Sequence, residues 1–286
     1  MILKNRTKSL IQVHIAVFLF GFSALFGKFL NLSPIVIVFG RVTFAAIALG
    51  AILILSKKHF KLKPKKDYFY MFFLGFIFAF HWAAFFQSVQ VSNIAIAVLT
   101  FSTYPLFVTF MEPYFFKEKI RQKDIIIALI TFSGIMLVIP SFELKNNFTQ
   151  GALWGIIAGF TGAMLTIYNK LFVKKYSGML LAFYECSFAA IILLPFVYCT
   201  QFKLGSSDVL LLILLGVIFT ALSHVLYITS VSHMKAQLAS IITCLEPVYG
   251  IIFAVILLNE IPTIRTLTGG LIILGSTIYA TLKPKD

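Results

Sequence analysis

The fold is decided by a stretch that the chain contains twice: residues 97–118 read AVLTFSTYPLFVTFMEPYFFKE, and residues 239–260 read ASIITCLEPVYGIIFAVILLNE. The two copies align without a gap at an offset of 142 residues, so that Pro105 faces Pro247 and Glu118 faces Glu260. Across residues 81–130 the same offset matches further identities, namely Ser88-Val89 with Ser230-Val231, Ala97 with Ala239, and Leu129-Ile130 with Leu271-Ile272. A proline inside a segment and a glutamate at its end keep one register, which indicates an internal duplication.

A second pair of stretches supports the duplication. Residues 39–47 read FGRVTFAAI, and residues 183–191 read FYECSFAAI. Opposite charges, Arg41 and Glu185, occupy the matching third position of the two copies. An internal duplication in a membrane protein is typical of a transporter.

Composition places most of this chain in lipid. Of 286 residues, 60% are hydrophobic and only 12% are charged, and the mean hydropathy is +0.97. A soluble domain carries about 25% charged residues. The net charge of +14 is therefore read as a topology signal in the loops and not as a nucleic-acid surface, which needs a basic face on a folded domain.

Ten apolar segments fill the chain and leave no room for a soluble domain. A bilayer-spanning helix needs about 20 apolar residues, and inside hydrocarbon every backbone group must find a partner within the segment, which favours helices. We expect an all-α membrane protein with helices over residues 9–30, 33–56, 68–90, 94–116, 124–140, 150–172, 177–199, 208–230, 236–258 and 262–282. The first is read as a retained helix and not a cleaved signal peptide, and the two repeats cover residues 9–140 and 150–282.

The lysines and arginines predict the orientation. If the N-terminus lies inside, the outer loops hold only Lys145, Lys203 and Arg265, and the other loop cations fall inside. This asymmetry predicts that both termini are cytoplasmic. Because each repeat has five helices, the second copy must enter the membrane inverted, with Glu118 inside and its counterpart Glu260 outside. Substrate sites of inverted repeats lie near the midplane, between the repeats.

These residues resemble a known family. The second copy is similar to the closing pattern of EamA-type carriers of the drug/metabolite transporter superfamily, through the residues Ala239-Ser240, Leu245-Glu246-Pro247-Val248, Leu258-Asn259-Glu260 and Gly269-Gly270-Leu271-Ile272-Ile273. The first copy is looser, with Tyr104-Pro105, Lys117-Glu118-Lys119, Ala128-Leu129-Ile130 and Gly134, and Arg41 also fits the family pattern. The resemblance covers essentially the whole chain. It implies ten helices, cytoplasmic termini, and carriage of small metabolites such as amino acids across the plasma (inner) membrane.

Charged and polar residues inside the predicted helices are the candidates for the site, because they are costly in lipid and usually face a cavity or a partner. Glu246 precedes Pro247 in the middle of a predicted helix, where the proline frees a carbonyl, and Tyr104 holds the matching place in the first copy. Glu246 is either a proton or amine site, or a carboxylate that bonds a neighbour beside a kink. Arg41 and Glu185 are either half-gates and zwitterion ligands, or structural charges satisfied locally.

Three aromatic and imidazole side chains complete the candidate set. His81 lies in the centre of a predicted helix beside Trp82, and its counterpart falls next to His224. Histidine titrates near physiological pH and can relay protons, although a buried histidine can equally be a neutral hydrogen-bonding group. Trp82 either stacks on substrate or packs. Further residues that could line a polar cavity are Ser102, Thr103, Tyr168, Asn169, Tyr184, Tyr227 and Tyr249.

The sequence favours a secondary carrier of small metabolites that works by alternating access, with amino acids as cargo and export as its direction; an uptake carrier or exchanger is the alternative. The chain has no nucleotide-binding motif, so the energy must come from a gradient, with protons as the candidate ion, or from the substrate itself. The absence of a Cys/His ligand spacing gives no support for a metal or cofactor, and no HExxH pattern supports a membrane enzyme. Expected partners are the substrate and lipid, and small-residue runs such as 155–159 leave a homodimer open.

Overall fold

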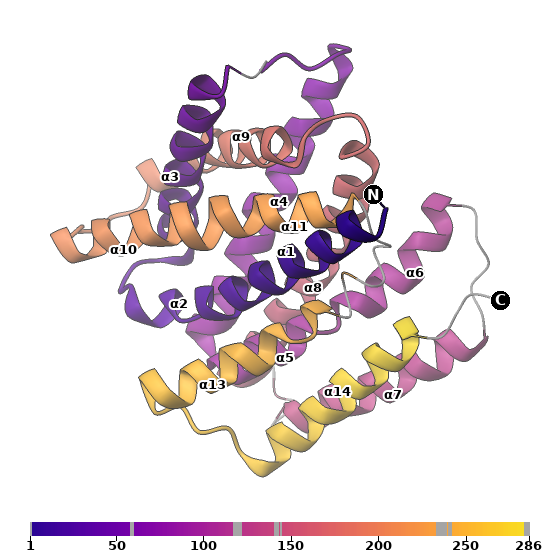
Figure 1. The fold of residues 1–286 in the computed structure, drawn as a ribbon. Helices are drawn as coiled ribbons and strands as arrows, with labels where there is room; N and C mark the ends of the chain where they lie inside the picture. The colour runs from indigo at the N-terminus through magenta and orange to yellow at the C-terminus, as the bar shows by residue number, and fades with distance from the viewer. Residues whose placement is uncertain are drawn as a thin grey trace.

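The computed structural model describes residues 2–57, 60–116, 122–139, 143, 145–232, 239 and 242–282, and all regular structure in these ranges is helical. Figure 1 shows the helices packed as one bundle, in which α7 and α14 lie side by side along one edge. The elements are α1 (Ile2–Ser23), α2 (Phe26–Phe29), α3 (Pro34–Leu55), α4 (Lys66–Val91), α5 (Ile94–Phe101), α6 (Tyr104–Phe116), α7 (Gln122–Val138), α8 (Asn147–Phe172), α9 (Gly178–Tyr198), α10 (Ser206–Gly216), η1 (Val217–Leu222), α11 (Ser223–Val231), α13 (Glu246–Leu258) and α14 (Ile264–Leu282).

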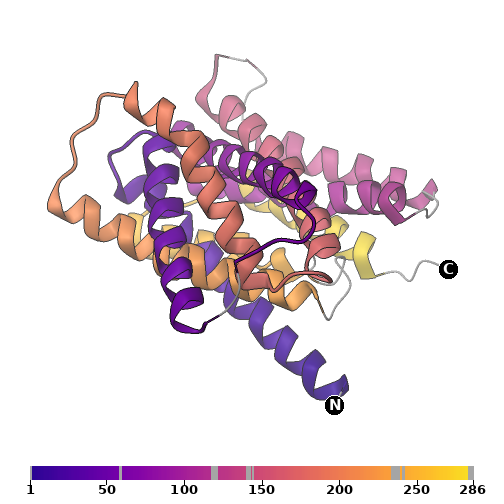
Figure 2. The same ribbon diagram turned by 90° about the horizontal axis from the view of Figure 1, so that it is seen from above.

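The helices coincide with the apolar segments predicted from the sequence. Seven helical spans in the described ranges are long and apolar enough to cross a membrane, and three shorter apolar helices cover residues 125–138, 246–258 and 264–276. The predicted helix 236–258 is described only in part, and Glu118 lies outside the described residues. The view from above in Figure 2 shows the helices lying around one another without a separate soluble domain among the parts that are drawn as helices.

The predicted helix 9–30 is interrupted at Ala24-Leu25, between α1 and α2, and two further predicted helices break at matching places. The first break, at Ser102-Thr103, separates α5 from α6, and the second, at Cys244-Leu245, directly precedes α13. Each new helix begins with the residue before the proline, so that Tyr104 starts α6 and Glu246 starts α13. The sequence offered a kink at Pro247 as one reading; in the structure, two residues leave the helical pattern and the proline lies in the first turn of the next helix, where its missing N–H is not needed. Discontinuous helices at corresponding positions of two repeats commonly mark a transport site.

A third irregularity lies between α10 and α11. Residues 217–222 form the π-helical turn η1, in which the Thr220 hydroxyl donates to the carbonyl of Leu215 at 2.7 Å. The turn points the Thr220 hydroxyl and the Phe219 carbonyl at the guanidinium of Arg41 on α3, which donates to them at 2.9 and 3.5 Å. Short π-helical turns inside helices occur frequently at functional sites.

Glycines let the two halves approach closely. A side-chain carbon added at Gly155 on α8 would lie 2.0 Å from the hydroxyl oxygen of Thr100 on α5, and one at Gly269 on α14 would lie 2.6 Å from the carbonyl oxygen of Gly134 on α7. One at Gly21 on α1 would meet Tyr249 of α13 at 2.7 Å. The small-residue runs therefore serve contacts within this chain, as such runs do between membrane helices generally.

Candidate functional site

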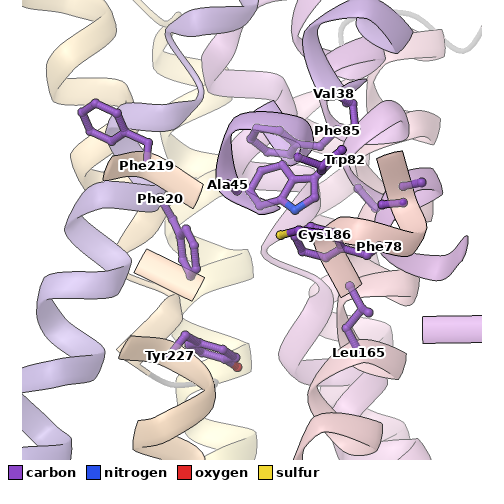
Figure 3. Packing of buried hydrophobic residues seen from close by; sticks show 14 of the residues in the cluster. Phe20, Val38, Ala45, Phe78, Trp82, Phe85, Leu165, Cys186, Phe219 and Tyr227 are labelled. Atoms are coloured by element: carbon purple, nitrogen blue, oxygen red, sulfur yellow. The ribbon is translucent and has the colours of Figure 1, made fainter. Parts of the chain in front are cut away.

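The central cavity is lined from both halves of the chain. Its walls come from α1, α4, α5 and α6 on one side of the duplication and from α8, α11, Thr243 and α13 on the other. The lining residues are Phe20, Phe78, His81, Trp82, Phe85, Phe101, Tyr104, Gly162, Leu165, Thr166, Asn169, His224, Tyr227, Thr243 and Glu246. Figure 3 shows Phe20 and Tyr227 on one side, with Trp82, Phe78 and Leu165 opposite them.

The cavity is small in this structure. Its volume is about 60 Å³, enough for a few water molecules, since one needs about 10–15 Å³ measured in this way. Sites for small ligands enclose about 300–1,000 Å³. The cavity is therefore smaller in this structure than a site that encloses a small ligand.

Glu246 brings a carboxylate to this cavity from the first turn of α13. The side chain is almost completely buried, and no hydrogen bond to its carboxylate occurs among the described residues. The positive end of the α13 dipole lies beside it and favours a negative charge there. Arg41 is close enough to interact with it electrostatically. Glu246 is therefore an ionisable group that remains available to a ligand or a proton.

Tyr104 takes part in a hydroxyl cluster that joins the two halves. Its hydroxyl lies 2.6 Å from that of Tyr227 on α11. Thr166 on α8 lies 3.3 Å from the Tyr104 hydroxyl and 3.1 Å from the Tyr227 hydroxyl. Three helices are thus held together at one wall of the cavity by groups that can each donate and accept.

His81 is fixed in one tautomer by its contacts. Its Nδ1 lies 2.9 Å from the carbonyl oxygen of Ala158 and 3.2 Å from the hydroxyl of Thr161. A carbonyl can only accept, so Nδ1 carries a proton, and in the neutral ring Nε2 is an acceptor. No hydrogen bond to Nε2 occurs among the described residues.

Glu185 and His224 form a buried pair. The Nε2 atom of His224 lies 2.5 Å from Oε2 of Glu185, joining α11 to α9. The imidazole also lies against Phe78, with ring centroids 4.6 Å apart. His224 lines the cavity, whereas Glu185 is fully buried behind it. A carboxylate and an imidazole in contact can share a proton.

Arg41 lies behind the cavity wall. Its guanidinium is fully buried and stacks on the indole of Trp82, 3.5 Å from the ring centroid. Its Nη1 atom and the Nε1 atom of Trp82 have no hydrogen-bond partner among the described residues. Trp82 therefore separates the fixed positive charge of Arg41 from the open space.

The structure brings all seven residues singled out from the sequence to one place, in two layers. Glu246, His81, Trp82, Tyr104 and His224 line the cavity, and Arg41 and Glu185 contact lining residues from behind. Of the wider polar set, Asn169 and Tyr227 line the cavity as well.

Sequence reasoning missed several lining residues, including Thr166, Thr243, Phe20 and Phe78. A helical signal could have found one of them: Thr166 lies three residues before Asn169 on α8, a spacing that puts side chains on one helix face. Thr243 precedes the break before α13, so the same spacing to Glu246 does not put the two on one helix face. No such signal marks the phenylalanines in so apolar a chain. In the described ranges, no three His, Cys, Asp or Glu residues are grouped as metal ligands would be.

Ion pairs stand at both ends of the bundle. Near the carboxyl end of α4, Lys28 lies 3.9 Å from Glu260 and donates to the carbonyl of Ser92 at 3.0 Å. Glu260 also accepts from the backbone N–H of Ile94, at the start of α5, at 3.0 Å. Near the amino end of α4, Lys175 pairs with Asp67. In the last turn of α8, Lys170 lies 3.3 Å from Glu112 of α6.

Comparison with known proteins identifies the chain. The model of the EamA-like transporter family matches residues 7–139 and, separately, residues 149–282. The uncharacterized transporter YxxF of Bacillus subtilis is 25% identical over 254 residues, which cover 87% of this chain and 81% of the relative. The S-adenosylmethionine uptake transporter of Rickettsia conorii is 25% identical over 245 residues, covering 85% and 81%.

Two further comparisons agree. The uncharacterized inner membrane transporter YicL of Salmonella typhimurium is 29% identical over 206 residues, covering 69% of this chain and 67% of the relative. A solved crystal structure superposes with a TM-score of 0.71 over 96% of this chain and 97% of its own length, at 15% identity, which shows a shared fold. Family and relatives indicate a transporter rather than an enzyme. The chain is thus a multi-pass protein of the plasma membrane that belongs to the EamA-like transporter family.

Proposed function

We propose that the protein is a secondary carrier that moves a small amino-bearing metabolite through the central cavity by alternating access. The observation that carries this proposal is the cavity itself, which both halves of the chain line and into which a broken helix brings the carboxylate of Glu246. Broken helices at a repeat interface hold the cargo in other carriers with duplicated folds.

The proposed architecture is two inverted five-helix repeats, residues 9–140 and 150–282, with both termini in the cytoplasm. Two separate matches to one family model support the duplication. The helix breaks at 102–103 and 244–245, again 142 residues apart, support the register. An odd number of helices per repeat inverts the second copy, and the cation distribution then assigns the amino end of α4 to the cytoplasm.

In the proposed cycle, alternating access depends on two ion pairs, one at each end of the cavity. Lys28 with Glu260 holds one end, and Lys170 with Glu112 holds the other. Both pairs are formed while the cavity is small, and we assign this form to a closed intermediate of the proposed cycle. Release of one pair, with the other kept, opens the cavity to one side only.

Amino acids and related compounds are the proposed cargo. A buried carboxylate suits an ammonium group, and hydrogen bonds to charged partners are the strong ones. Relatives are named for uptake of S-adenosylmethionine, which is itself an amino-acid derivative. The sequence favours export, whereas these relatives are named for uptake, so both directions belong in the experiment.

Counterflow in proteoliposomes tests the proposal. Vesicles containing the purified protein are loaded with one unlabelled compound from a panel of amino acids and S-adenosylmethionine, and entry of the labelled compound is followed. A carrier shows saturable entry that internal cargo accelerates. Entry that internal cargo does not accelerate indicates a channel, and no entry for any compound overturns the proposed cargo class.

Glu246→Gln is the diagnostic variant for the site. We expect counterflow to fall by at least tenfold, because one charged hydrogen bond is worth about that factor. Glu143→Gln, an exposed glutamate outside the helices, is the matched control and should keep normal flux. Normal flux through normally expressed Glu246→Gln protein removes Glu246 from the site.

A further inference from the structure

We propose that the cavity selects organic cations that carry N–H donors, a deepening that rests on the proposed transport function. The inference comes from the polar atoms of the lining that remain without a protein partner. They are mostly hydrogen-bond acceptors, and the rest of the wall is aromatic.

Three hydrogen-bond acceptors that are available to a ligand come from three different helices. Glu246 offers a carboxylate from α13. His81 offers Nε2 from α4, because its Nδ1 proton is committed to the Ala158 carbonyl. Asn169 offers Oδ1 from α8, and this buried oxygen has no hydrogen-bond partner among the described residues. A buried acceptor without a partner costs about 1–3 kcal/mol, so a cargo with N–H donors recovers what the empty site loses.

Two lining side chains add donors without a partner in the described part of the chain. The indole Nε1 of Trp82 can only donate, and the amide of Asn169 carries N–H donors beside its acceptor oxygen. These donors suit an acceptor on the cargo, such as a carboxylate or hydroxyl oxygen. Acceptors still outnumber donors in the lining, which therefore matches a molecule with a positive, donor-rich end and opposes a molecule whose main charge is negative.

The aromatic wall favours the same charge. Phe20, Phe78, Phe101 and Tyr227 surround the space together with Trp82. Aromatic faces attract cations, and the attraction reaches about 2 kcal/mol when water is excluded. The faces of the same rings repel anions, because the ring quadrupole makes them negative.

Charge balance points in the same direction. With neutral histidines, the buried charges around the cavity are Arg41, Glu185 and Glu246, which leave one negative charge in excess. The pairs Lys170–Glu112 and Lys28–Glu260 are each neutral. Because an uncompensated charge away from water is costly, the site calls for one monovalent cation, either cargo or a proton.

The two tryptophans of the chain, Trp82 and Trp154, permit a binding assay that does not depend on transport. In the Trp154→Phe protein, all indole fluorescence comes from the cavity. The probes are four compounds of one shape: benzylammonium, benzyltrimethylammonium, benzyl alcohol and benzoate. They separate the contribution of charge from that of N–H donors.

We expect benzylammonium to bind about tenfold or more tightly than benzyl alcohol, and benzyltrimethylammonium to lie between them, because it has the charge without the donors. Benzoate should bind most weakly. Asn169→Leu should weaken benzylammonium about tenfold and leave benzyltrimethylammonium unchanged. Asn169→Asp keeps an acceptor oxygen and should retain or tighten binding, which guards against a folding defect of the leucine variant.

Equal affinity for benzoate and benzylammonium would overturn the inference, and so would equal losses of both cations in Asn169→Leu. If the cations bind as expected but no counterflow occurs, the selectivity stands and the transport proposal fails. The two outcomes are therefore distinguishable.

Discussion

Lys28 and Lys170 lie 142 residues apart in the sequence and form ion pairs at opposite ends of the bundle, Lys28 with Glu260 and Lys170 with Glu112. Each pair joins the first half of the chain to the second. The lysines thus share the register of the two copies, and in the proposed cycle each holds one entrance of the cavity. Their partners are not equivalent, since the residue 142 positions after Glu112 is Ala254.

Removal of either lysine should bias the carrier towards one open side. In a protein whose native cysteines are replaced, Thr243→Cys places a thiol in the cavity wall. An impermeant maleimide added outside intact cells should label it about two- to fivefold faster after Lys28→Met, because a partly exposed pair contributes up to about 1 kcal/mol.

The opposite change in the labelling rate is expected when the ion pair at the other end of the bundle is removed. Lys170→Met should slow labelling from outside, because it releases the cytoplasmic end. Lys61→Met, which changes an exposed lysine between α3 and α4, is the control and should change neither rate. Faster external labelling in both lysine variants contradicts the assignment of the pairs to opposite ends.

The buried pair Glu185–His224 should couple transport to protons. Glu185→Gln removes the ionisable partner of His224 while it keeps the shape of the side chain. We expect accumulation driven by a pH gradient to be lost and counterflow at equal pH to continue, since exchange needs no net proton movement. Substrate-linked pH changes inside vesicles, read with a trapped dye, measure the first quantity.

A histidine away from the cavity provides the control for this experiment. His14→Gln, on the exposed side of α1, should behave as the unaltered protein does. If the Glu185→Gln protein still accumulates cargo when a pH gradient is applied, the Glu185–His224 pair has a structural role only.

Trp82 should act as a shield over Arg41. Trp82→Ala uncovers the guanidinium, whose Nη1 has no partner among the described residues, and the cavity then presents a fixed positive charge. We expect benzoate, which should inhibit counterflow weakly in the unaltered protein, to inhibit this variant about tenfold more strongly. Trp82→Phe keeps an aromatic cover and should not gain this inhibition.

The glycine contacts predict a pair of opposite stability effects. Gly155→Ala overpacks the contact between α5 and α8, because the added carbon would lie 2.0 Å from the Thr100 hydroxyl oxygen and 3.2 Å from the carbonyl oxygen of Ala97. A loss of about 1–3 kcal/mol is expected for such overpacking. Gly275→Ala on α14 meets nothing within 4 Å, and should be neutral or gain about 0.5–1 kcal/mol from the better helix former. Thermal unfolding in detergent compares the two, and equal shifts would contradict the close contact at Gly155.

Much of the fold could be predicted because lipid imposes a simple rule, that a spanning segment is apolar and helical. The segment that contains Glu246 and the matching segment that contains Tyr104 could be recognised in the sequence as a repeat. The helix breaks were not, because proline is compatible both with a kink and with the first turn of a new helix.

Which buried side chains contact each other inside the bundle could not be predicted either. Glu185 and His224 are 39 residues apart, and the repeat register matched Glu185 with Arg41 without predicting a contact for either, since helices that are apolar on all sides give little sign of which face is buried. The same lack of pattern explains why the phenylalanines of the cavity wall went unrecognised.

The two matching breaks have one further consequence. The second break carries a carboxylate at Glu246, and the first carries a phenol at Tyr104, so duplication has left one strongly acidic position where perfect symmetry would give two. In the proposed cycle the Glu185–His224 pair passes the proton on, and Glu246 holds one monovalent occupant at a time. Exchange of a singly charged cargo for a proton would then be one for one and electrically silent, and the membrane potential alone would not drive it.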